Sequence, residues 1–160
     1  MFYSTLPEVI LTTILLIPTL TSASPIQKRD TAEQYIFANC INNVTLAAYS
    51  AIFWYYPDFL PDYPEPQETA YVNELSAEPF EGQTTIVTSP FQLNATIPAN
   101  ATNAVVGALV STEASASSYA GPMAVIKGSG LVFYSPADNE NCYEEYWQRD
   151  VSSRDCFLWG

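Results

Sequence analysis

The sequence predicts an all-β domain, mainly antiparallel, folded as a small β-sandwich or barrel with room for one short helix. Strand-forming Tyr, Phe, Val, Ile, Thr and Trp recur in short runs along the chain. Turn-forming residues separate the runs, as in Pro61-Asp62-Tyr63-Pro64 and Gly128-Ser129-Gly130. Many short strands with turns between them indicate a sandwich or barrel, because each strand must bury one face against a common core.

Nine segments fit a strand pattern: residues 34–39, 50–56, 70–75, 84–93, 104–111, 123–127, 131–134, 142–148 and 156–159. The second segment also allows a helix, because apolar residues from Leu46 to Tyr56 have helical spacing behind a possible cap at Asn42-Asn43. The β-branched and aromatic composition of 52–56 favours the strand, which we prefer. Any other helical structure is expected in 111–119.

The first 29 residues predict export from the cell. Residues 1–23 fit a signal peptide, because the apolar stretch from Val9 is shorter than the roughly 20 residues that span a membrane. Small residues place cleavage after Ala23, and Lys28-Arg29 fits a dibasic processing site. Residues 24–29 are then a pro-segment and 30–160 a single secreted domain. The opposing interpretations are a buried N-terminal element and two solvated charges; Glu8 is unusual in a signal peptide.

The chain is strongly acidic, with 5 Lys and Arg residues against 17 Asp and Glu and a net charge of −12. Cleavage after Arg29 would remove two cations and one acid, Glu8, so the mature domain would be more acidic still. Phosphate backbones and anionic lipids repel such a protein. We therefore expect no nucleic-acid partner and no membrane insertion after signal removal, and the acidity suits solubility or a basic partner.

The sequence contains no histidine, which rules out Ser-His-Asp and Cys-His catalysis and histidine metal sites. Paired carboxylates remain as catalytic groups for glycoside hydrolysis. The candidates are Asp58, Asp62, Glu78, Glu81, Glu144, Glu145 and Asp150. Neighbouring Glu144 and Glu145 would point to opposite faces of a strand and could not act together. We prefer the interpretation that these acids are solvated surface groups, and we assign no catalytic residue.

The turn 138–141 is rich in the oxygen ligands that Ca²⁺ prefers, but it lacks the length and glycine of an EF-hand loop. An Asx-turn explains it better, so we predict no metal and no cofactor. Trp54, Trp147 and Trp159 would stack on sugar rings if they shared an exposed face, although core packing is preferred. The proline-rich loop 57–66 is either a recognition loop, with Phe59 and Tyr63 as anchors, or a packed connection, which we prefer.

Cys40, Cys142 and Cys156 predict at least one disulfide in an oxidising compartment, and three pairings are possible. Cys142–Cys156 would close a short loop, worth about 3 kcal/mol in the chain-entropy model, and Cys40–Cys142 would close a longer loop worth more. We favour Cys40–Cys142. Cys156 is then free, capped, or available for a disulfide-linked dimer.

Three sequons, at Asn43, Asn94 and Asn100, predict N-glycosylation behind an export signal, and the alternative is that they are plain turn or strand residues. If the sequons carry glycans, these asparagines must lie on the surface.

Short motifs run through most of the mature chain: Phe37-Ala38-Asn39-Cys40, Ala51-Ile52-Phe53-Trp54-Tyr55-Tyr56, Phe80-Glu81-Gly82, Asn141-Cys142-Tyr143 and Asp155-Cys156-Phe157. In these motifs the chain resembles fungal small secreted (effector-like) proteins of unknown function. The resemblance implies a secreted, β-rich protein and brings no activity with it. Members usually carry one further cysteine at the end, which is absent after Cys156 and leaves the pairing of Cys156 open.

Together these observations predict a secreted, acidic, N-glycosylated protein that binds a protein or glycan partner without enzymatic activity. The alternative is a carboxylate-dependent polysaccharide hydrolase. A membrane-active toxin is disfavoured by the negative charge, because such peptides are usually basic.

Overall fold

The computed structural model describes residues 33–56, 65–117 and 121–150. This part of the chain is all-β and antiparallel, as the sequence predicts, and its strands form two sheets. No helix within these ranges is long and apolar enough to cross a bilayer. The predicted signal peptide, the pro-segment, Cys156 and the strand expected at 156–159 lie outside the described residues.

The larger sheet has seven strands, in the order β3-β2-β1-β10-β8-β6 with β9 beside β10. Their bounds are β1 (Gln34–Asn42), β2 (Ala48–Tyr55), β3 (Glu68–Asn73), β6 (Leu109–Ser111), β8 (Met123–Lys127), β9 (Val132–Tyr134) and β10 (Glu140–Asp150). The first and last described strands, β1 and β10, pair at the centre of this sheet, so its middle depends on contacts between distant parts of the sequence.

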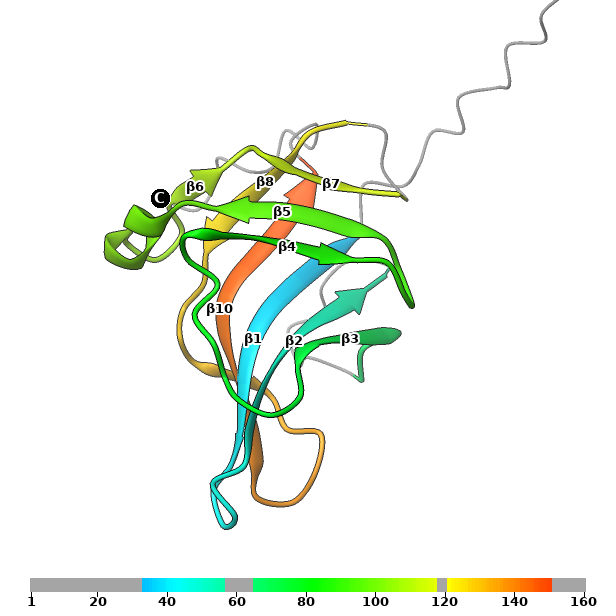
Figure 1. Cartoon of the computed structure of the whole chain (residues 1–160), viewed down its shortest axis with the longest axis vertical. Coiled ribbons are helices and arrows are strands. Elements are labelled where there is room, and N and C mark those ends of the chain that lie inside the picture. Colours follow the sequence, from blue (N-terminus) through cyan, green and yellow to red (C-terminus); the bar gives the residue numbers. More distant parts are fainter. Residues whose placement is uncertain (1–32, 57–64, 118–120, 151–160) are drawn as a thin grey trace, which may run out of the picture.

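The smaller sheet has three strands, β4 (Gln83–Val87), β5 (Leu93–Ile97) and β7 (Ala114–Ala116). Figure 1 shows these strands crossing in front of β1, β2 and β10, so that the two sheets form a sandwich. The 3₁₀-helix η1 (Ala99–Asn103) follows β5 at one end of the smaller sheet.

The main core lies between the two sheets, where Tyr35 and Phe37 of β1 face Leu93 and Ile97 of β5. The intervening residues of β1 are also buried, because they pack on the outer face of the larger sheet against aromatic residues of β2 and β9. The residues of this second cluster are Ile36, Ala38, Cys40, Ala51, Phe53, Tyr55, Phe133 and Cys142. A strand buried on both faces reads as a continuous apolar run, as β1 does.

A disulfide joins Cys40 and Cys142, the pairing that the sequence favours, with a Cα–Cα distance of 4.0 Å. The two cysteines are directly opposite each other in the β1–β10 pair, and both are buried. The bond lies on the outer face of the larger sheet and ties together strands separated by 102 positions in the sequence.

Two predictions of local structure are wrong. The strand expected at 84–93 is two strands, β4 and β5, because Pro90 cannot donate a ladder hydrogen bond and the chain turns between them. The helix expected in 111–119 is absent from its described part, where Ala114–Ala116 forms strand β7 beside β5. Alternate residues of β7 are buried and exposed, a period of two that fits a strand facing a core. The short helix lies instead in η1.

The segment with two interpretations, behind Asn42, is a strand as preferred. The Asn42 side chain does not cap a helix; its Oδ1 accepts hydrogen bonds from the backbone N–H groups of Val44 and Thr45, at 3.0 and 2.9 Å. It therefore shapes the turn between β1 and β2. Smaller shifts occur at β3, which starts at Glu68, and at β6, which occupies only the end of the predicted 104–111 strand.

Candidate functional site

Two groups of side chains in the described residues carry chemistry, and the first surrounds Lys127. Its Nζ lies 3.5 Å from Glu81 Oε1 and 3.8 Å from Glu145 Oε2. It donates a hydrogen bond to the Tyr146 hydroxyl over 3.1 Å and sits 4.2 Å from the centre of that ring. The Tyr146 hydroxyl in turn donates to Glu81. We call Glu81, Lys127, Glu145 and Tyr146 the lysine cluster.

A bulge in β10 explains how two neighbouring side chains reach the same lysine. Phe37 pairs with Tyr146 and Ala38 pairs with Glu144, so Glu145 is the extra residue between them. A bulge redirects side chains relative to regular alternation. Glu145 consequently lies with Tyr146 beside Lys127, whereas Glu144 has different partners. The sequence predicts this separation of Glu144 from Glu145.

The two carboxylates of the lysine cluster have pKa values displaced in opposite directions. Burial acts to raise the pKa of Glu81, but hydrogen bonds from Tyr146 and its own backbone, together with Lys127, leave it below its ordinary value. Burial raises the pKa of Glu145, and the charge of Glu81 adds to this, although Lys127 and Asn39 oppose it. A pair of acids with divergent pKa values is one arrangement that supports acid–base chemistry, and it also occurs in purely structural ion pairs.

The second group lies on the outer face of the larger sheet, around the disulfide. Tyr49 donates a hydrogen bond to Glu140 Oε1 over 2.6 Å, and its ring centre is 5.4 Å from that of Tyr71. Tyr134 packs against Phe53, with ring centres 5.7 Å apart. Tyr71 is 56 % exposed, whereas Tyr49 and Tyr134 are half-buried. We call Tyr49, Tyr71, Tyr134, Glu65 and Glu140 the tyrosine face.

Negative charge surrounds these rings. Burial raises the pKa of Tyr49, and Glu140 raises it further both as hydrogen-bond acceptor and as a charge. Burial likewise raises the pKa of Tyr134, assisted by Glu65, Tyr71 and Glu140. The phenols of Tyr49 and Tyr134 therefore stay neutral, and the carboxylates make the local potential negative. An arrangement of aromatic rings edged by carboxylates suits ligands that offer hydroxyl donors or a positive charge.

Of the remaining predicted acids, the structure describes the side chains of Glu78 and Glu144, and these have separate partners. Glu78 accepts a hydrogen bond from Asn73 Nδ2 at the surface, and Glu144 accepts two from Ser129, one from its backbone and one from its hydroxyl. Glu144 thereby fixes the turn before β9. Asp58 and Asp62 lie outside the described residues, and of Asp150 only the backbone is described. The turn expected at 138–141 is a backbone turn, because the Glu140 backbone N–H donates to Ala137 O; the Asn141 side chain instead accepts a hydrogen bond from the Ser135 hydroxyl.

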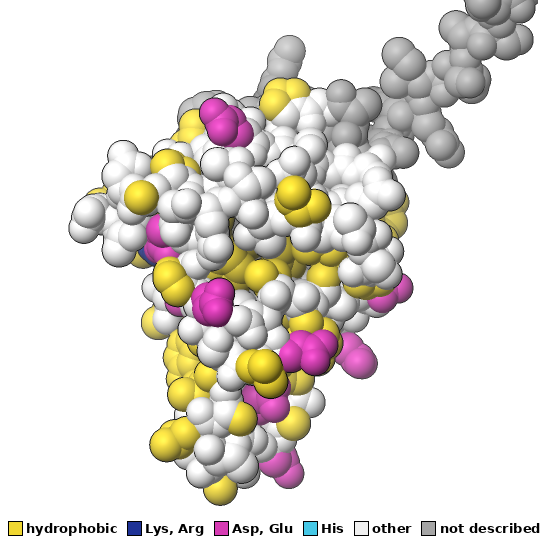
Figure 2. All heavy atoms as spheres, viewed as in Figure 1, with side chains coloured by type: hydrophobic (Ala, Val, Ile, Leu, Met, Phe, Trp, Pro, Cys, Tyr) yellow, Lys and Arg dark blue, Asp and Glu magenta, His cyan; other side chains and the backbone are white. Residues whose placement is uncertain are grey.

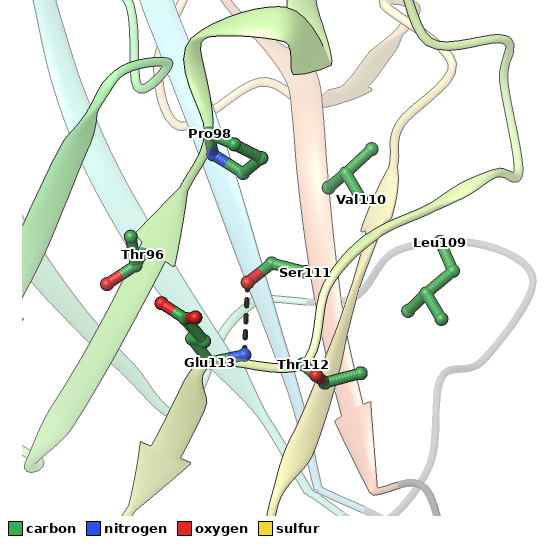
Figure 3. Close-up of a pocket in the computed structure, with 7 residues that line it drawn as sticks. All are labelled: Thr96, Pro98, Leu109, Val110, Ser111, Thr112 and Glu113. Carbon is green, nitrogen blue, oxygen red and sulfur yellow. Dashed lines mark hydrogen bonds between the residues drawn. The ribbon is translucent and has the colours of Figure 1, made fainter.

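An open cleft of about 370 Å³ lies between the edges of β5 and β6. Figure 3 shows Thr96 and Pro98 on one side of it and Leu109 and Val110 on the other, with Glu113 next to Thr96, whose backbone N–H donates to Glu113 O. Ser111 Oγ accepts a hydrogen bond from the Glu113 backbone N–H, at 3.0 Å. Glu113 is the single carboxylate among the described residues that line this cleft, so those residues do not supply the two acids that glycoside hydrolysis requires.

The predicted aromatic and modification sites fall in different places. Trp54 packs against the main core, and Trp147 packs against the outer cluster, so the two do not share a platform. Trp159, Phe59 and Tyr63 lie outside the described residues. The three sequon asparagines are all exposed: Asn43, Asn94 and Asn100. Alternation in β5 points Asn94 out of the smaller sheet, away from the core.

Sequence reasoning missed the tyrosine face. Tyr49, Tyr71 and Tyr134 come from three strands, and only the sheet order brings them together. The alternation of Tyr49, Ala51 and Phe53 on one side of β2 was a usable signal, since it places an aromatic at each end of a small residue. Figure 2 shows the side of the sandwich that carries the smaller sheet, opposite the tyrosine face. Acidic side chains are scattered over this side, and hydrophobic side chains line a hollow just below the position of β4.

No protein-family model, curated protein or solved structure matches the chain.

Proposed function

We propose that this chain is a secreted, N-glycosylated binding protein that engages a protein or glycan partner through the tyrosine face and acts without enzymatic chemistry. The observation that carries the proposal is the exposure of Tyr71 beside two further tyrosines and two carboxylates on one sheet face. Tyrosine is enriched in binding surfaces because it gives a large contact area and a hydrogen-bonding end at low entropic cost.

The internal supports of the face favour a binding role. Tyr49 is fixed by its hydrogen bond to Glu140 and lies beside the disulfide, 3.8 Å from Cys142 Sγ. Preorganised side chains lose little freedom when a partner binds, so more of the contact energy appears as affinity. The buried disulfide also suits the oxidising compartments of the secretory pathway and the cell exterior.

The positions of the sequons are compatible with this use of the face. Asn94 points outward from the smaller sheet, on the opposite side of the sandwich from Tyr71. A glycan there would leave the tyrosine face uncovered. Asn43 lies in the β1–β2 turn, and its backbone N–H donates to Asn139 O next to Glu140, so a glycan at Asn43 would border the face.

The experiment is capture by the immobilised secreted protein from cell-wall polysaccharides and from extracellular protein extracts. The proposal predicts that the wild type retains a partner and that Tyr71→Ala loses it. Ile86→Ala is the matched control, because Ile86 is 67 % exposed on the outer face of the smaller sheet. Equal retention by wild type and Tyr71→Ala would show that the tyrosine face is not the binding surface. If no partner is captured at all, the proposed binding function is contradicted.

A second candidate is a carboxylate-dependent polysaccharide hydrolase centred on the lysine cluster, favoured by the opposite pKa displacements of Glu81 and Glu145. Its test is release of reducing sugars by the secreted protein from a panel of wall polysaccharides. A hydrolase would lose release in both Glu81→Gln and Glu145→Gln but keep it in Glu113→Gln. Our account predicts no release above background from any of these proteins.

A further inference from the structure

The lysine cluster shows how this fold accommodates a cation. Lys127 sits over the ring of Tyr146, at 4.2 Å, with oxygens of both Glu81 and Glu145 within 4 Å of its ammonium nitrogen. The ring contributes a cation–π contact, and the two carboxylates supply opposite charge. All the components come from β8, β10 and the segment before β4.

The tyrosine face repeats the aromatic and acidic components without a cation. Tyr49 and Tyr71 stand with ring centres 5.4 Å apart, Glu140 is bound to the Tyr49 hydroxyl, and Glu65 is close enough to Tyr134 to act on its ionisation. Among the side chains that the structure describes, Lys127 is the one cation, and it is engaged in the lysine cluster. The face therefore has no positive charge of its own within the described residues.

We propose that the tyrosine face binds an arginine or lysine side chain of a protein partner, seated against the exposed Tyr71 ring with Glu140 as its carboxylate partner. This inference rests on the proposed binding function and names the chemistry of its partner. Charge complementarity is the argument for it: the chain carries a net charge of −12, and the face adds two carboxylates to exposed aromatic surface. A guanidinium can stack on tyrosine and bind a carboxylate at once, which favours arginine over lysine.

The test is an NMR titration of the secreted protein with two capped glycine peptides, one containing a central arginine and the other the uncharged isostere citrulline. We expect the arginine peptide to shift the ring resonances of Tyr49, Tyr71 and Tyr134 saturably, and the citrulline peptide to leave them in place. Glu140→Gln and Tyr71→Ala should each weaken the affinity for the arginine peptide about threefold to fivefold. That is the effect of losing one exposed charge or one cation–π contact.

Glu113→Gln is the matched control, because it removes the same charge from an exposed position beside the smaller sheet. The inference is overturned if the citrulline peptide shifts the tyrosine ring resonances as strongly as the arginine peptide, or if the arginine peptide gives no saturable shift. It is equally overturned if Glu113→Gln weakens binding of the arginine peptide as much as Glu140→Gln does. It is also overturned if a neutral glucan oligosaccharide shifts the same rings and the arginine peptide does not.

Failure of this inference and failure of the proposed function give different results. If Tyr71→Ala loses the captured partner but the arginine peptide does not shift the tyrosine resonances, the face binds a partner by other chemistry. If Tyr71→Ala keeps the captured partner, the proposed function itself fails. Glu140→Gln preserves the shape of its side chain, so the titration remains informative even if Tyr71→Ala folds poorly.

Discussion

The hydroxyl of Tyr49 donates a hydrogen bond of 2.6 Å to Glu140 Oε1, joining residues 91 positions apart in the sequence. The bond connects β2 to the start of β10 across β1, beside the disulfide on the same sheet face. One contact thus stabilises the pairing of distant strands and holds a ring and a carboxylate of the tyrosine face in fixed relation. Structure and proposed function are therefore linked at this residue pair.

Removing the Tyr49 hydroxyl should be measurable as a loss of stability. Tyr49→Phe keeps the ring but deletes a hydrogen bond to a charged acceptor, which typically contributes about 1.5–3 kcal/mol. We expect the lower part of that range from urea unfolding, because Glu140 is only partly buried. Tyr56→Phe is the control, since Tyr56 is exposed just after β2. An unchanged unfolding midpoint for Tyr49→Phe would show that the bond contributes little.

The Cys40–Cys142 disulfide should contribute more than any single hydrogen bond. It closes a loop with a sequence separation of 102, for which the chain-entropy model gives about 4.7 kcal/mol. The double variant Cys40→Ala, Cys142→Ala should unfold at much lower urea, and reduction of the wild type should reproduce the shift. A double variant with wild-type stability would contradict the central role given to the β1–β10 pair.

The two glutamates around Lys127 should respond oppositely to neutralisation at pH 7. The folded environment favours ionised Glu81, since its pKa lies below the ordinary value of 4.5. Glu81→Gln should therefore lower the free energy of unfolding, by about 0.5–1 kcal/mol for a partly exposed ion pair. The folded environment disfavours ionised Glu145, so Glu145→Gln should leave stability unchanged or raise it. Greater destabilisation by Glu145→Gln than by Glu81→Gln would contradict this assignment.

The same displacements fix the pH dependence. The contribution of Glu81 is present above its ordinary pKa and is lost as the pH falls through its lower folded pKa. Glu145 binds its proton more tightly when folded, so its contribution is full below the ordinary pKa and is lost as the pH rises through the raised folded value. In urea unfolding between pH 4 and 7, about the range of these transitions, the stability of Glu145→Gln minus that of wild type should increase with rising pH, because the variant lacks the loss caused by ionising Glu145.

A buried glutamine offers a stabilising substitution. Gln148 is fully buried, and within the described residues its Oε1 has no hydrogen-bond partner, while its Nε2 donates to the weak acceptor Met123 Sδ. Gln148→Met has a similar shape and removes a buried acceptor whose desolvation costs about 1–3 kcal/mol. We expect a higher thermal midpoint, with Gln92→Met at an exposed position as the control. A lower midpoint would indicate that the amide makes a contact that matters.

The strands that the sequence predicts well are those with strong local signals. Met123–Lys127 forms β8 within its predicted bounds, and β1 and β2 follow from aromatic and β-branched runs. The Thr- and Ala-rich region between 84 and 116 was harder, because small and polar residues give weak periodicity. There Pro90 marked the break between β4 and β5, and the alternation around Ala114 and Ala116 marked β7.

The candidate surfaces depended on information that no local pattern contains. Glu81 and Glu145 were among the predicted acids, yet their meeting at Lys127 required both the bulge in β10 and the position of the segment before β4. The tyrosine face needed the order β3-β2-β1-β10-β9 to bring its residues together. The disulfide was the exception, because few pairings were possible and loop entropy favoured the longer loop.

The most direct measurement of the central claim is the amount of partner retained by Tyr71→Ala relative to Ile86→Ala, on purified proteins of equal thermal stability. Both substitutions truncate an exposed apolar side chain, but on opposite outer faces of the sandwich. The tyrosine-face account predicts that Tyr71→Ala loses most of the retained partner and that Ile86→Ala retains as much as wild type. Equal retention by the two variants, or greater loss with Ile86→Ala, would contradict it.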